Sequence, residues 1–234
     1  MSHITLTNVV FTRRLDRTSS PGVADQTPSS RERRIIDDVS LTISNGQRVG
    51  ILGSNGAGKT TLLRLIAGIF QPDSGTIERE SDVSALLDTG YGMVDSLSAR
   101  ENCVSRLIVS GVKKREIGLL IDRIEEFVEL GEYFDQPMRS FSSGMFARVV
   151  FALVTARPHD VIVIDEGFGL ADEHFRRKAQ GVLQKLYFDT SILIFASHNA
   201  ELLKSTCERG IIIKDGKIFF DGDINQAIEI NHSF

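Results

Sequence analysis

The sequence Gly53-Ser54-Asn55-Gly56-Ala57-Gly58-Lys59-Thr60 decides how the rest of the chain is organised. It fits the pattern G-x-x-x-x-G-K-[ST], in which a glycine-rich loop directs backbone N–H groups toward the phosphates of a nucleotide. Glycines are required because side chains would block this close approach. The lysine can reach the β- and γ-phosphates, and the threonine hydroxyl can join the shell of a bound Mg²⁺. Thr61 extends the same polar edge, so the expected phosphate-binding residues are Gly53, Ser54, Asn55, Gly56, Ala57, Gly58, Lys59, Thr60 and Thr61.

The segments on either side of this loop have the patterns that the motif requires. Residues 47–52 are predicted to form a buried strand, and residues 61–67 a helix whose N-terminal dipole faces the phosphates. A glycine-rich turn before an ordinary core helix is the alternative explanation. The motifs further along the chain argue against that alternative.

Length and composition favour one domain with a substantial core. The chain has 234 residues, and its 27 basic residues nearly balance 31 acidic ones, so nucleic acid is not an expected partner. Cys103 and Cys207 have no neighbours at metal-binding spacing, which favours a reducing compartment. The N-terminus lacks a leader pattern, and no apolar run is long enough to cross a membrane. We therefore expect a cytoplasmic chain whose membrane part, where one is needed, comes from a partner.

The N-terminal region predicts a small antiparallel sheet. Strands are expected at His3–Val10, Val39–Ile43 and Thr76-Ile77, and Asn45-Gly46 is predicted to be a hairpin turn into the strand of the phosphate loop. Between the first two strands, residues 13–34 are rich in Ser, Pro, Arg and Asp, which is typical of a long exposed insertion. Its arginines suit lipid headgroups, so we expect it to face a membrane or a partner.

The middle of the chain is predicted to be helical. Ser98 and Glu101 have the spacing of a capping box, so a helix is expected to begin there. Apolar residues at helical spacing predict another helix that Gly131 ends, with the residues Ile117, Leu120, Ile121, Ile124 and Phe127. A third helix is expected at Gly144–Thr155 before Pro158. We therefore expect a helical subdomain at 98–156, inserted into a core formed by 1–97 and 157–234.

The remaining strands predict an α/β core. The continuous apolar runs at Val161–Ile164 and Ser191–Ala196 are typical of strands buried in a parallel sheet. Two more strands are expected within Gly210–Asp221, joined at Asp215-Gly216 and followed by a short helix. This alternation of strands and helices places the phosphate loop in an α/β fold with a helical insertion.

Polar residues follow the two buried strands. Asp165-Glu166 ends the first, where Asp165 can hold Mg²⁺ and Glu166 can orient or deprotonate an attacking water. His198 follows the second strand, where it can donate a hydrogen bond to the γ-phosphate. A surface turn and a structural histidine are the alternatives, and the nearby phosphate loop argues against them.

The order of these motifs, with Phe141-Ser142-Ser143-Gly144-Met145 between them, resembles the ABC-type ATPase family across nearly the whole chain. The resemblance implies one domain over 1–234, with an α/β P-loop NTPase (RecA-like) core, an N-terminal antiparallel β subdomain and an inserted α-helical subdomain. It also implies ATP and Mg²⁺ as cofactors and a head-to-tail homodimer. In that dimer Ser142, Ser143 and Gly144 contact the γ-phosphate of ATP bound to the partner subunit.

Individual roles follow from the same resemblance. Lys59, Glu166 and His198 are expected to be catalytic, and Thr60 and Asp165 to bind the metal. Arg13 aligns where the family stacks an aromatic ring on adenine, and Phe11 is the nearby alternative. Thr89 departs from the family pattern, because it stands where many members have the glutamine that is the usual Mg²⁺ ligand and coupling contact. Asp172 lies in the segment that resembles a D-loop.

The Ser-Ser-Gly-Met variant, with Ser84–Leu87 and Arg100-Glu101-Asn102, resembles the ATPase subunits of bacterial polysaccharide exporters, for O-antigen, lipopolysaccharide, capsule or teichoic acid. This implies a peripheral ATPase on the cytoplasmic face of the inner membrane. It implies an integral-membrane subunit that carries the polysaccharide and docks at Leu87–Val112, and no appended carbohydrate-binding domain. The alternatives are a soluble ABC-type ATPase acting on ribosomes or DNA and a regulatory ATP clamp that is not coupled to transport.

Overall fold

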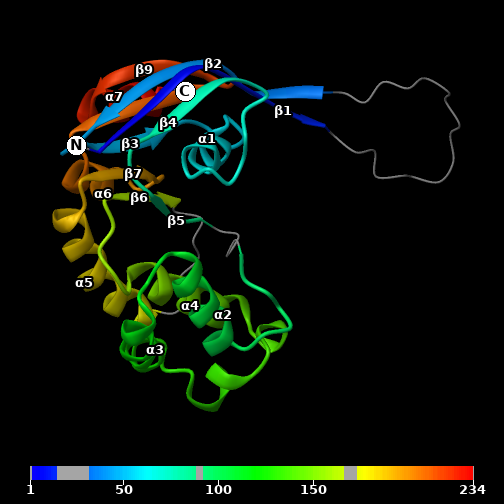
Figure 1. Ribbon diagram of the computed structural model, residues 1–234. Helices are drawn as coiled ribbons and strands as arrows, with labels where there is room; N and C mark the ends of the chain where they lie inside the picture. Colours follow the sequence, from blue (N-terminus) through cyan, green and yellow to red (C-terminus); the bar gives the residue numbers. More distant parts are fainter. Residues whose placement is uncertain (1, 15–31, 88–91, 166–172, 234) are drawn as a thin grey trace, which may run out of the picture. The chain divides into compact units, whose positions relative to one another are not determined.

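The computed structural model describes residues 2–14, 32–87, 92–165 and 173–233, and the chain divides into two compact units (Figure 1). The first unit contains residues 1–81 and 196–234, and the second contains residues 82–195. Each unit has its own strands and helices and is described separately below.

The first unit contains the predicted antiparallel sheet. Its strand order is β2-β1-β4, formed by β2 (Glu32–Ser44), β1 (His3–Arg14) and β4 (Ser74–Arg79). Ile4 lies opposite Ile43 in this register, and both side chains are fully buried. β2 begins seven residues earlier than the sequence predicts, because β1 and β2 remain paired as far as Arg14 opposite Glu32. The first residues of β2 are polar, so no alternation of apolar and polar residues indicated that the strand begins there.

A second group of strands in this unit surrounds β3 (Arg48–Leu52). β3 runs parallel to β8 (Arg209–Lys214), and β8 pairs antiparallel with β9 (Lys217–Asp223). The turn between β8 and β9 lies at Asp215-Gly216, as predicted, with φ angles of 50° and 78°. Positive φ at both central residues suits a two-residue hairpin.

The predicted hairpin at Asn45-Gly46 is wrong. The turn exists, with φ of 84° at Gly46 and a 3.1 Å bond from the Gln47 amide to the Ser44 carbonyl. It joins two different sheets, however, because β2 pairs with β1 whereas β3 pairs with β8. β3 is almost entirely buried and needs neighbours in a parallel sheet, while β2 alternates between buried and exposed residues and fits an antiparallel edge.

The helices among the described residues of the first unit are α1 (Lys59–Ile66), α6 (Ala200–Thr206) and α7 (Ile224–His232). α7 packs on β8 and β9 (Figure 1), and the Asp223 carboxylate caps its first turn by accepting from two backbone amides. A Cβ at Gly210 would lie 2.4 Å from the Cβ of Ala227. The missing side chain at Gly210 is therefore what lets α7 approach the sheet. α6 has no counterpart among the sequence predictions.

The second unit begins with a partly buried strand and contains two fully buried strands. β5 (Val83–Leu86) runs parallel to β6 (Val161–Asp165), and β7 (Ile192–Ala196) follows in the order β5-β6-β7. Every residue of β6 and β7 is buried, as the apolar runs predict. β5 is a short strand that no sequence pattern indicated.

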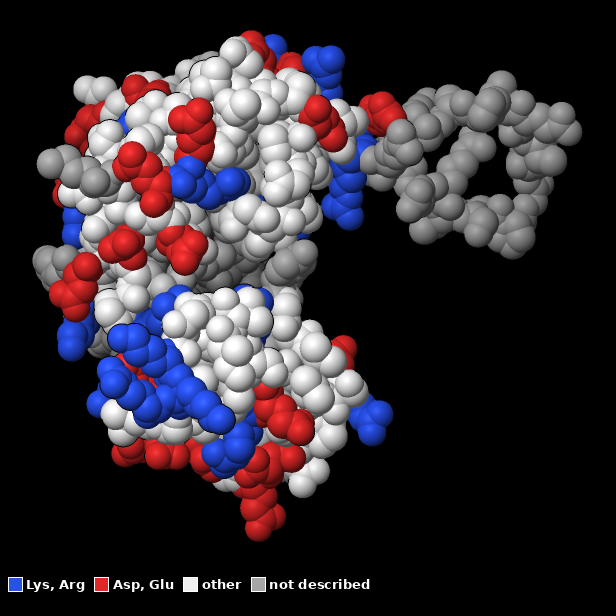
Figure 2. Space-filling model, in the orientation of Figure 1, with Lys and Arg blue, Asp and Glu red and all other residues white. Residues whose placement is uncertain are grey.

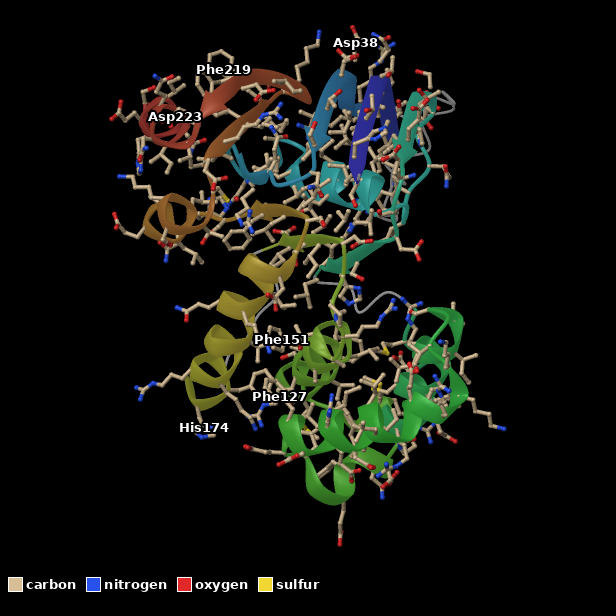
Figure 3. All side chains as sticks on the ribbon, turned by 60° about the vertical axis from the view of Figure 1, so that its left-hand side comes forward. Asp38, Phe127, Phe151, His174, Phe219 and Asp223 are labelled. Carbon is tan, nitrogen blue, oxygen red and sulfur yellow. The ribbon has the colours of Figure 1, made fainter. Side chains whose placement is uncertain are left out.

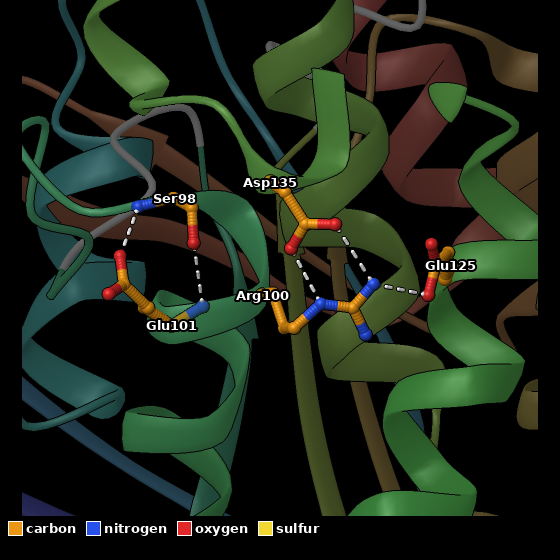
Figure 4. Close-up of polar contacts among 5 residues, drawn as sticks. All are labelled: Ser98, Arg100, Glu101, Glu125 and Asp135. Atoms are coloured by element: carbon orange, nitrogen blue, oxygen red, sulfur yellow. Dashed lines mark hydrogen bonds and ion pairs between the residues drawn. The ribbon is translucent and has the colours of Figure 1, made fainter. Parts of the chain in front are cut away.

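The helices of the second unit are α2 (Ala99–Val109), α3 (Lys114–Val128), α4 (Ser143–Thr155) and α5 (Glu173–Asp189), with short 3₁₀ turns η1 (Gly131–Asp135) and η2 (Met138–Ser140). The predicted capping box is present (Figure 4). The Glu101 amide donates to the Ser98 hydroxyl at 3.1 Å, and the Ser98 amide donates to the Glu101 carboxylate at 2.8 Å. Among the described segments, none of the helices combines the length and apolar character that a membrane crossing requires.

α3 buries the predicted face but ends earlier than expected. Ile117, Ile121 and Ile124 are buried in an apolar cluster shared with α2 and α4. The helix stops at Val128, because Glu129 adopts a left-handed conformation with φ of 53°. The expected stop at Gly131 is therefore wrong by three residues, since that glycine begins η1 instead.

Candidate nucleotide-binding site

The loop 53–61 connects β3 to α1 in the first unit, and its glycines are required by geometry. Gly53 has φ of 138°, and a Cβ there would lie 2.2 Å from the Ile213 carbonyl oxygen. Gly58 has φ of 110°, and a Cβ there would lie 2.7 Å from the Ile35 carbonyl oxygen. The loop is thus pressed against backbone on both flanks, and only glycine fits at these two positions.

Lys59 is held against its own loop. Its side chain is buried, and Nζ donates to the carbonyl oxygens of Gly53 at 2.7 Å and Ser54 at 3.1 Å. The loop residues around Lys59 differ in their exposure to solvent. The tip of the loop, Ser54-Asn55-Gly56, is exposed, whereas Ala57 and Gly58 are buried. Thr60 and Thr61, in the first turn of α1, are partly buried.

The start of α1 is suited to an anion. Its N-cap is Gly58, which makes no side-chain cap bond, and the first turn contains no acidic residue. The helix dipole favours negative charge at this end. The predicted phosphate-binding residues therefore form one continuous segment from the end of β3 into the first turn of α1.

His198 also belongs to the first unit. It is exposed and follows directly after β7, between two residues with capping contacts. The Ser197 hydroxyl accepts from the Asn199 amide at 2.9 Å, and the Asn199 side chain caps α6 by accepting from the Leu202 amide at 3.1 Å. These bonds fix the backbone on both sides of the histidine.

The two residues considered for adenine binding lie on β1. Arg13 is exposed and lies opposite Arg33 on β2. Phe11 is partly buried, and its ring stacks on Phe70 with the centroids 5.1 Å apart and the planes 4° from parallel. One face of the Phe11 ring is therefore already covered.

Other predicted site residues lie in the second unit. Asp165 ends β6 and is 8% exposed. The Ser142 hydroxyl caps α4 by accepting from the Met145 amide at 3.2 Å, and Ser143 and Gly144 form the first turn of that helix. Glu166, Thr89 and Asp172, together with 15–31 of the polar insertion, lie outside the described residues.

A cluster of aromatic and basic side chains in the second unit was missed by the sequence analysis. Phe127, Phe151 and Phe175 come from α3, α4 and α5, and their ring centroids lie 5.3 to 5.9 Å apart. Figure 3 shows Phe127 and Phe151 beside each other, with His174 at the nearby start of α5. The spacing of these phenylalanines along the chain carries no signal that they meet.

Basic side chains gather over the helices of the second unit (Figure 2). Two basic side chains lie against the rings of the aromatic cluster. Arg148 lies 5.2 Å from the centroid of Phe175. Lys178 lies 4.8 Å from that of Phe127 and donates to the Glu129 carboxylate at 2.6 Å. The Lys178 bond holds the pKa of Glu129 below its ordinary value. The cluster therefore ties α5, which follows the Asp165 segment, to α3 and α4.

A second unforeseen contact centres on Arg100 of α2 (Figure 4). Its guanidinium donates to Asp135 at 2.6 and 3.2 Å and to Glu125 at 2.7 Å, and it lies 5.0 Å from the ring centroid of Phe134. The hydrogen bond from Arg100 lowers the pKa of Asp135. One arginine thus joins α2, α3 and η1.

Comparisons with known proteins identify the family of this chain. Residues 36–169 match the family model described as ABC transporter. The O-antigen export system ATP-binding protein RfbE of Yersinia enterocolitica is 39% identical over 184 residues, which cover 79% of this chain and 77% of that protein. The polysialic acid transport ATP-binding protein KpsT of Escherichia coli is 37% identical over 206 residues, covering 87% and 92%.

A longer relative and a solved structure complete the comparison. The ABC transporter protein AbcA of Aeromonas salmonicida is 34% identical over 197 residues, and the match covers 84% of this chain but only 64% of that protein. The dimeric post-hydrolysis structure of the ATP-binding cassette MJ0796, bound to ADP and Pi, has a TM-score of 0.72 at 21% identity, covering 94% of this chain and 98% of that one. The α/β fold expected from the motifs is thereby confirmed.

Proposed function

This chain belongs to the ABC transporter family, and from that premise we propose that it is the ATP-binding and ATP-hydrolysing subunit of a transporter that exports a lipid-linked polysaccharide. The observation that carries the proposal is the similarity to RfbE and KpsT over more than three quarters of each chain. Their names are those of export and transport proteins for polysaccharides. This similarity favours export over a soluble or regulatory ATPase.

The phosphates of ATP bind at the exposed tip of the loop, residues 54–56. Lys59 then exchanges its bonds to the Gly53 and Ser54 carbonyls for phosphate oxygens, where its positive charge forms stronger, charge-assisted bonds. The N-terminal dipole of α1 stabilises the charge that develops during hydrolysis. The buried carbonyl contacts behind the loop keep it in place before ATP arrives.

Mg²⁺ fits the residues that the sequence assigned to it. Thr60 offers a hydroxyl beside Lys59, and Asp165 offers a buried carboxylate at the end of β6. Hydroxyl and carboxylate oxygens are ligands that Mg²⁺ takes, with waters and phosphates completing its shell. When bound, the ion neutralises charge shared by the β- and γ-phosphates.

Hydrolysis uses Glu166 to orient or deprotonate the attacking water and His198 to donate to the γ-phosphate. Two chains form a head-to-tail homodimer around two ATP molecules. In this dimer Ser142, Ser143 and Gly144 present the exposed N-terminus of α4 to the ATP held by the partner subunit. A hydroxyl and free helix amides are suitable donors for that phosphate.

Arg13 is the residue we propose to stack on adenine. Its side chain is exposed, and a planar guanidinium can cover a base. Phe11 is the weaker candidate because one face of its ring already lies against Phe70.

The integral-membrane subunit docks on the region Leu87–Val112. Three apolar side chains there are well exposed, at 48% for Val94, 58% for Ile108 and 78% for Val109. The Asn102 side chain fixes Val94 by accepting from its amide at 2.7 Å and donating to its carbonyl at 3.0 Å. The backbone that carries Val94 is thus ordered. We propose that the membrane subunit meets this region at the cytoplasmic face of the inner membrane.

The decisive experiment uses the Glu166→Gln variant, with Glu201→Gln on exposed α6 as the matched control. Wild type and Glu201→Gln should hydrolyse ATP at the same rate, and Glu166→Gln should be inactive yet dimeric when ATP is added. Tagged Glu166→Gln protein, captured with ATP from detergent-solubilised bacterial membranes, should bring a multi-helix membrane protein at equal stoichiometry. Equal, slow hydrolysis by wild type and Glu166→Gln would refute the enzyme claim, and capture of ribosomes or DNA would refute transport.

A further inference from the structure

The turn between β8 and β9 lies directly behind the phosphate-binding loop. The Gly216 amide donates to the Ala57 carbonyl oxygen at 3.3 Å. The Gly216 carbonyl oxygen accepts from the Asp37 amide of β2 at 2.9 Å. One glycine of the hairpin turn is therefore hydrogen-bonded to the loop on one side and to β2 on the other.

The three segments meet without room for side chains. A Cβ at Gly216 would lie 2.7 Å from the Ile35 carbonyl oxygen, and a Cβ at Gly58 would lie 2.7 Å from the same atom. The Ile35 carbonyl thus faces the hairpin turn and the phosphate loop at once. A shift of the turn relative to β2 would be transmitted to the loop, since packed backbone of this kind does not deform smoothly.

An ion pair holds the turn on β2. Lys217, the residue after Gly216, places Nζ 3.2 Å from the Asp37 carboxylate, and Arg34 places Nη1 2.8 Å from it. The Asp37 side chain is 22% exposed, so the carboxylate is partly sheltered between the two strands. The bonds to Lys217 first and Arg34 second lower the pKa of Asp37, so the carboxylate is charged at neutral pH.

We propose that Asp37 and Lys217 are positioning residues for the phosphate loop, which act by fixing the Gly216 peptide behind Ala57. The inference rests on the proposed function, because it assigns these residues a part in ATP binding. Neither residue belongs to the phosphate loop itself. Their effect reaches the phosphates through the hydrogen bond from Gly216 to Ala57 and therefore through the direction of the loop amides.

The test compares Asp37→Asn and Lys217→Gln with Asp221→Asn. Asp221 forms a bidentate ion pair with Arg209, with both bonds at 2.7 Å, at the other end of the same β8–β9 hairpin. All three changes remove one charge and leave the backbone unaltered. Lys217→Arg retains the ion pair and serves as the conservative variant.

Two readouts are measured on the full chain. In the nucleotide-free protein, amide hydrogen exchange of residues 54–58 should be faster in Asp37→Asn and Lys217→Gln and unchanged in Asp221→Asn and Lys217→Arg. In ATPase assays the first two variants should raise KM for ATP roughly two- to fivefold at unchanged kcat, the size expected when a partly exposed ion pair is lost. The double variant should be no worse than Asp37→Asn alone, because that single change already removes the pair with Lys217 as well as the pair with Arg34.

Faster exchange at 54–58 in all three variants, or in none of them, would overturn the inference, because the pair would then act only through general stability or surface charge. The two readouts also separate this inference from the proposed function. If the wild type neither binds nor hydrolyses ATP, the proposed function fails, while the exchange comparison still decides whether Asp37 and Lys217 position the loop.

Discussion

The Lys59 ammonium donates a hydrogen bond of 2.7 Å to the carbonyl oxygen of Gly53, the first glycine of its own loop. The lysine is therefore already in place before a nucleotide binds. Replacing Lys59 with Ala removes the positive charge that meets the phosphates. We expect kcat/KM for ATP to fall by about 100-fold or more, the usual effect of losing one donor to a developing charge.

Steady-state ATPase measurements test this expectation, with Lys204→Ala on the exposed face of α6 as the control. The control should retain wild-type activity. Similar losses in both variants would show that charge alone, rather than the position of Lys59, explains the effect.

Replacing Gly53 and replacing Gly118 with alanine should have opposite effects on the free energy of unfolding. Gly53 has φ of 138° and a carbonyl oxygen 2.2 Å from the position of its missing Cβ, so Gly53→Ala should abolish ATP binding and destabilise the fold by more than about 1 kcal/mol. Gly118 lies in α3, and a Cβ added there would meet no atom of a neighbouring segment within 4 Å. Gly118→Ala should therefore stabilise the chain by about 0.5 to 1 kcal/mol. Urea unfolding at pH 7 measures both, and a destabilised Gly118→Ala variant would contradict the helix assignment.

The ion pair between Arg100 and Asp135 should make the stability of the fold depend on pH. The hydrogen bond from Arg100 lowers the pKa of Asp135 below the ordinary 3.8, so the ion pair stabilises the fold above that pH and loses its effect as the pH falls through the lowered pKa. Arg100→Gln should lower the free energy of unfolding at pH 7, and its difference from wild type should narrow below pH 3.8.

The matched control for this experiment is Arg115→Gln. Arg115 pairs with Glu116 at 3.6 Å, and both side chains are more than half exposed, so its loss should have little effect at any pH. A difference between Arg100→Gln and wild type that stays constant from pH 7 to pH 3 would contradict the assigned role of Asp135.

The two cysteines should be chemically silent in the native protein. Burial raises the pKa of each thiol, at Cys103 and at Cys207, to about 12. Since only the thiolate is reactive, alkylation by iodoacetamide at pH 8 should be slow in the folded chain and fast in urea. Rapid modification of folded protein would show that the units around these residues open readily.

Local chemistry made parts of this fold predictable. The phosphate loop, the Ser98–Glu101 capping box and the hairpin at Asp215-Gly216 each depend on residues within a few positions of one another. The same turn chemistry failed at Asn45-Gly46, because a turn specifies a reversal of the chain and does not specify which strands then pair. Pairing there depends on the burial of β3 on both faces, which is a property of the whole sheet.

Contacts between distant segments could not be foreseen from the sequence. Arg100 meets Glu125 and Asp135, which lie 25 and 35 residues further along the chain. The link from Gly216 to Ala57 spans a still longer stretch and uses backbone atoms alone. Such contacts leave no periodicity or motif, so the sequence located the phosphate loop but not what supports it.

The pairing of β1 and β2 as far as Arg14 opposite Glu32 has a practical consequence. The segment between these two residues leaves and re-enters the sheet at adjacent positions, so its length is independent of the register that holds the antiparallel sheet together. Because the entropy of closing a loop grows only with the logarithm of its length, this position can accept a longer or shorter segment at small cost in stability. It is therefore a natural place to graft an affinity tag or a fluorescent reporter, anchored at Arg14 and Glu32, the last pair in the register of β1 and β2.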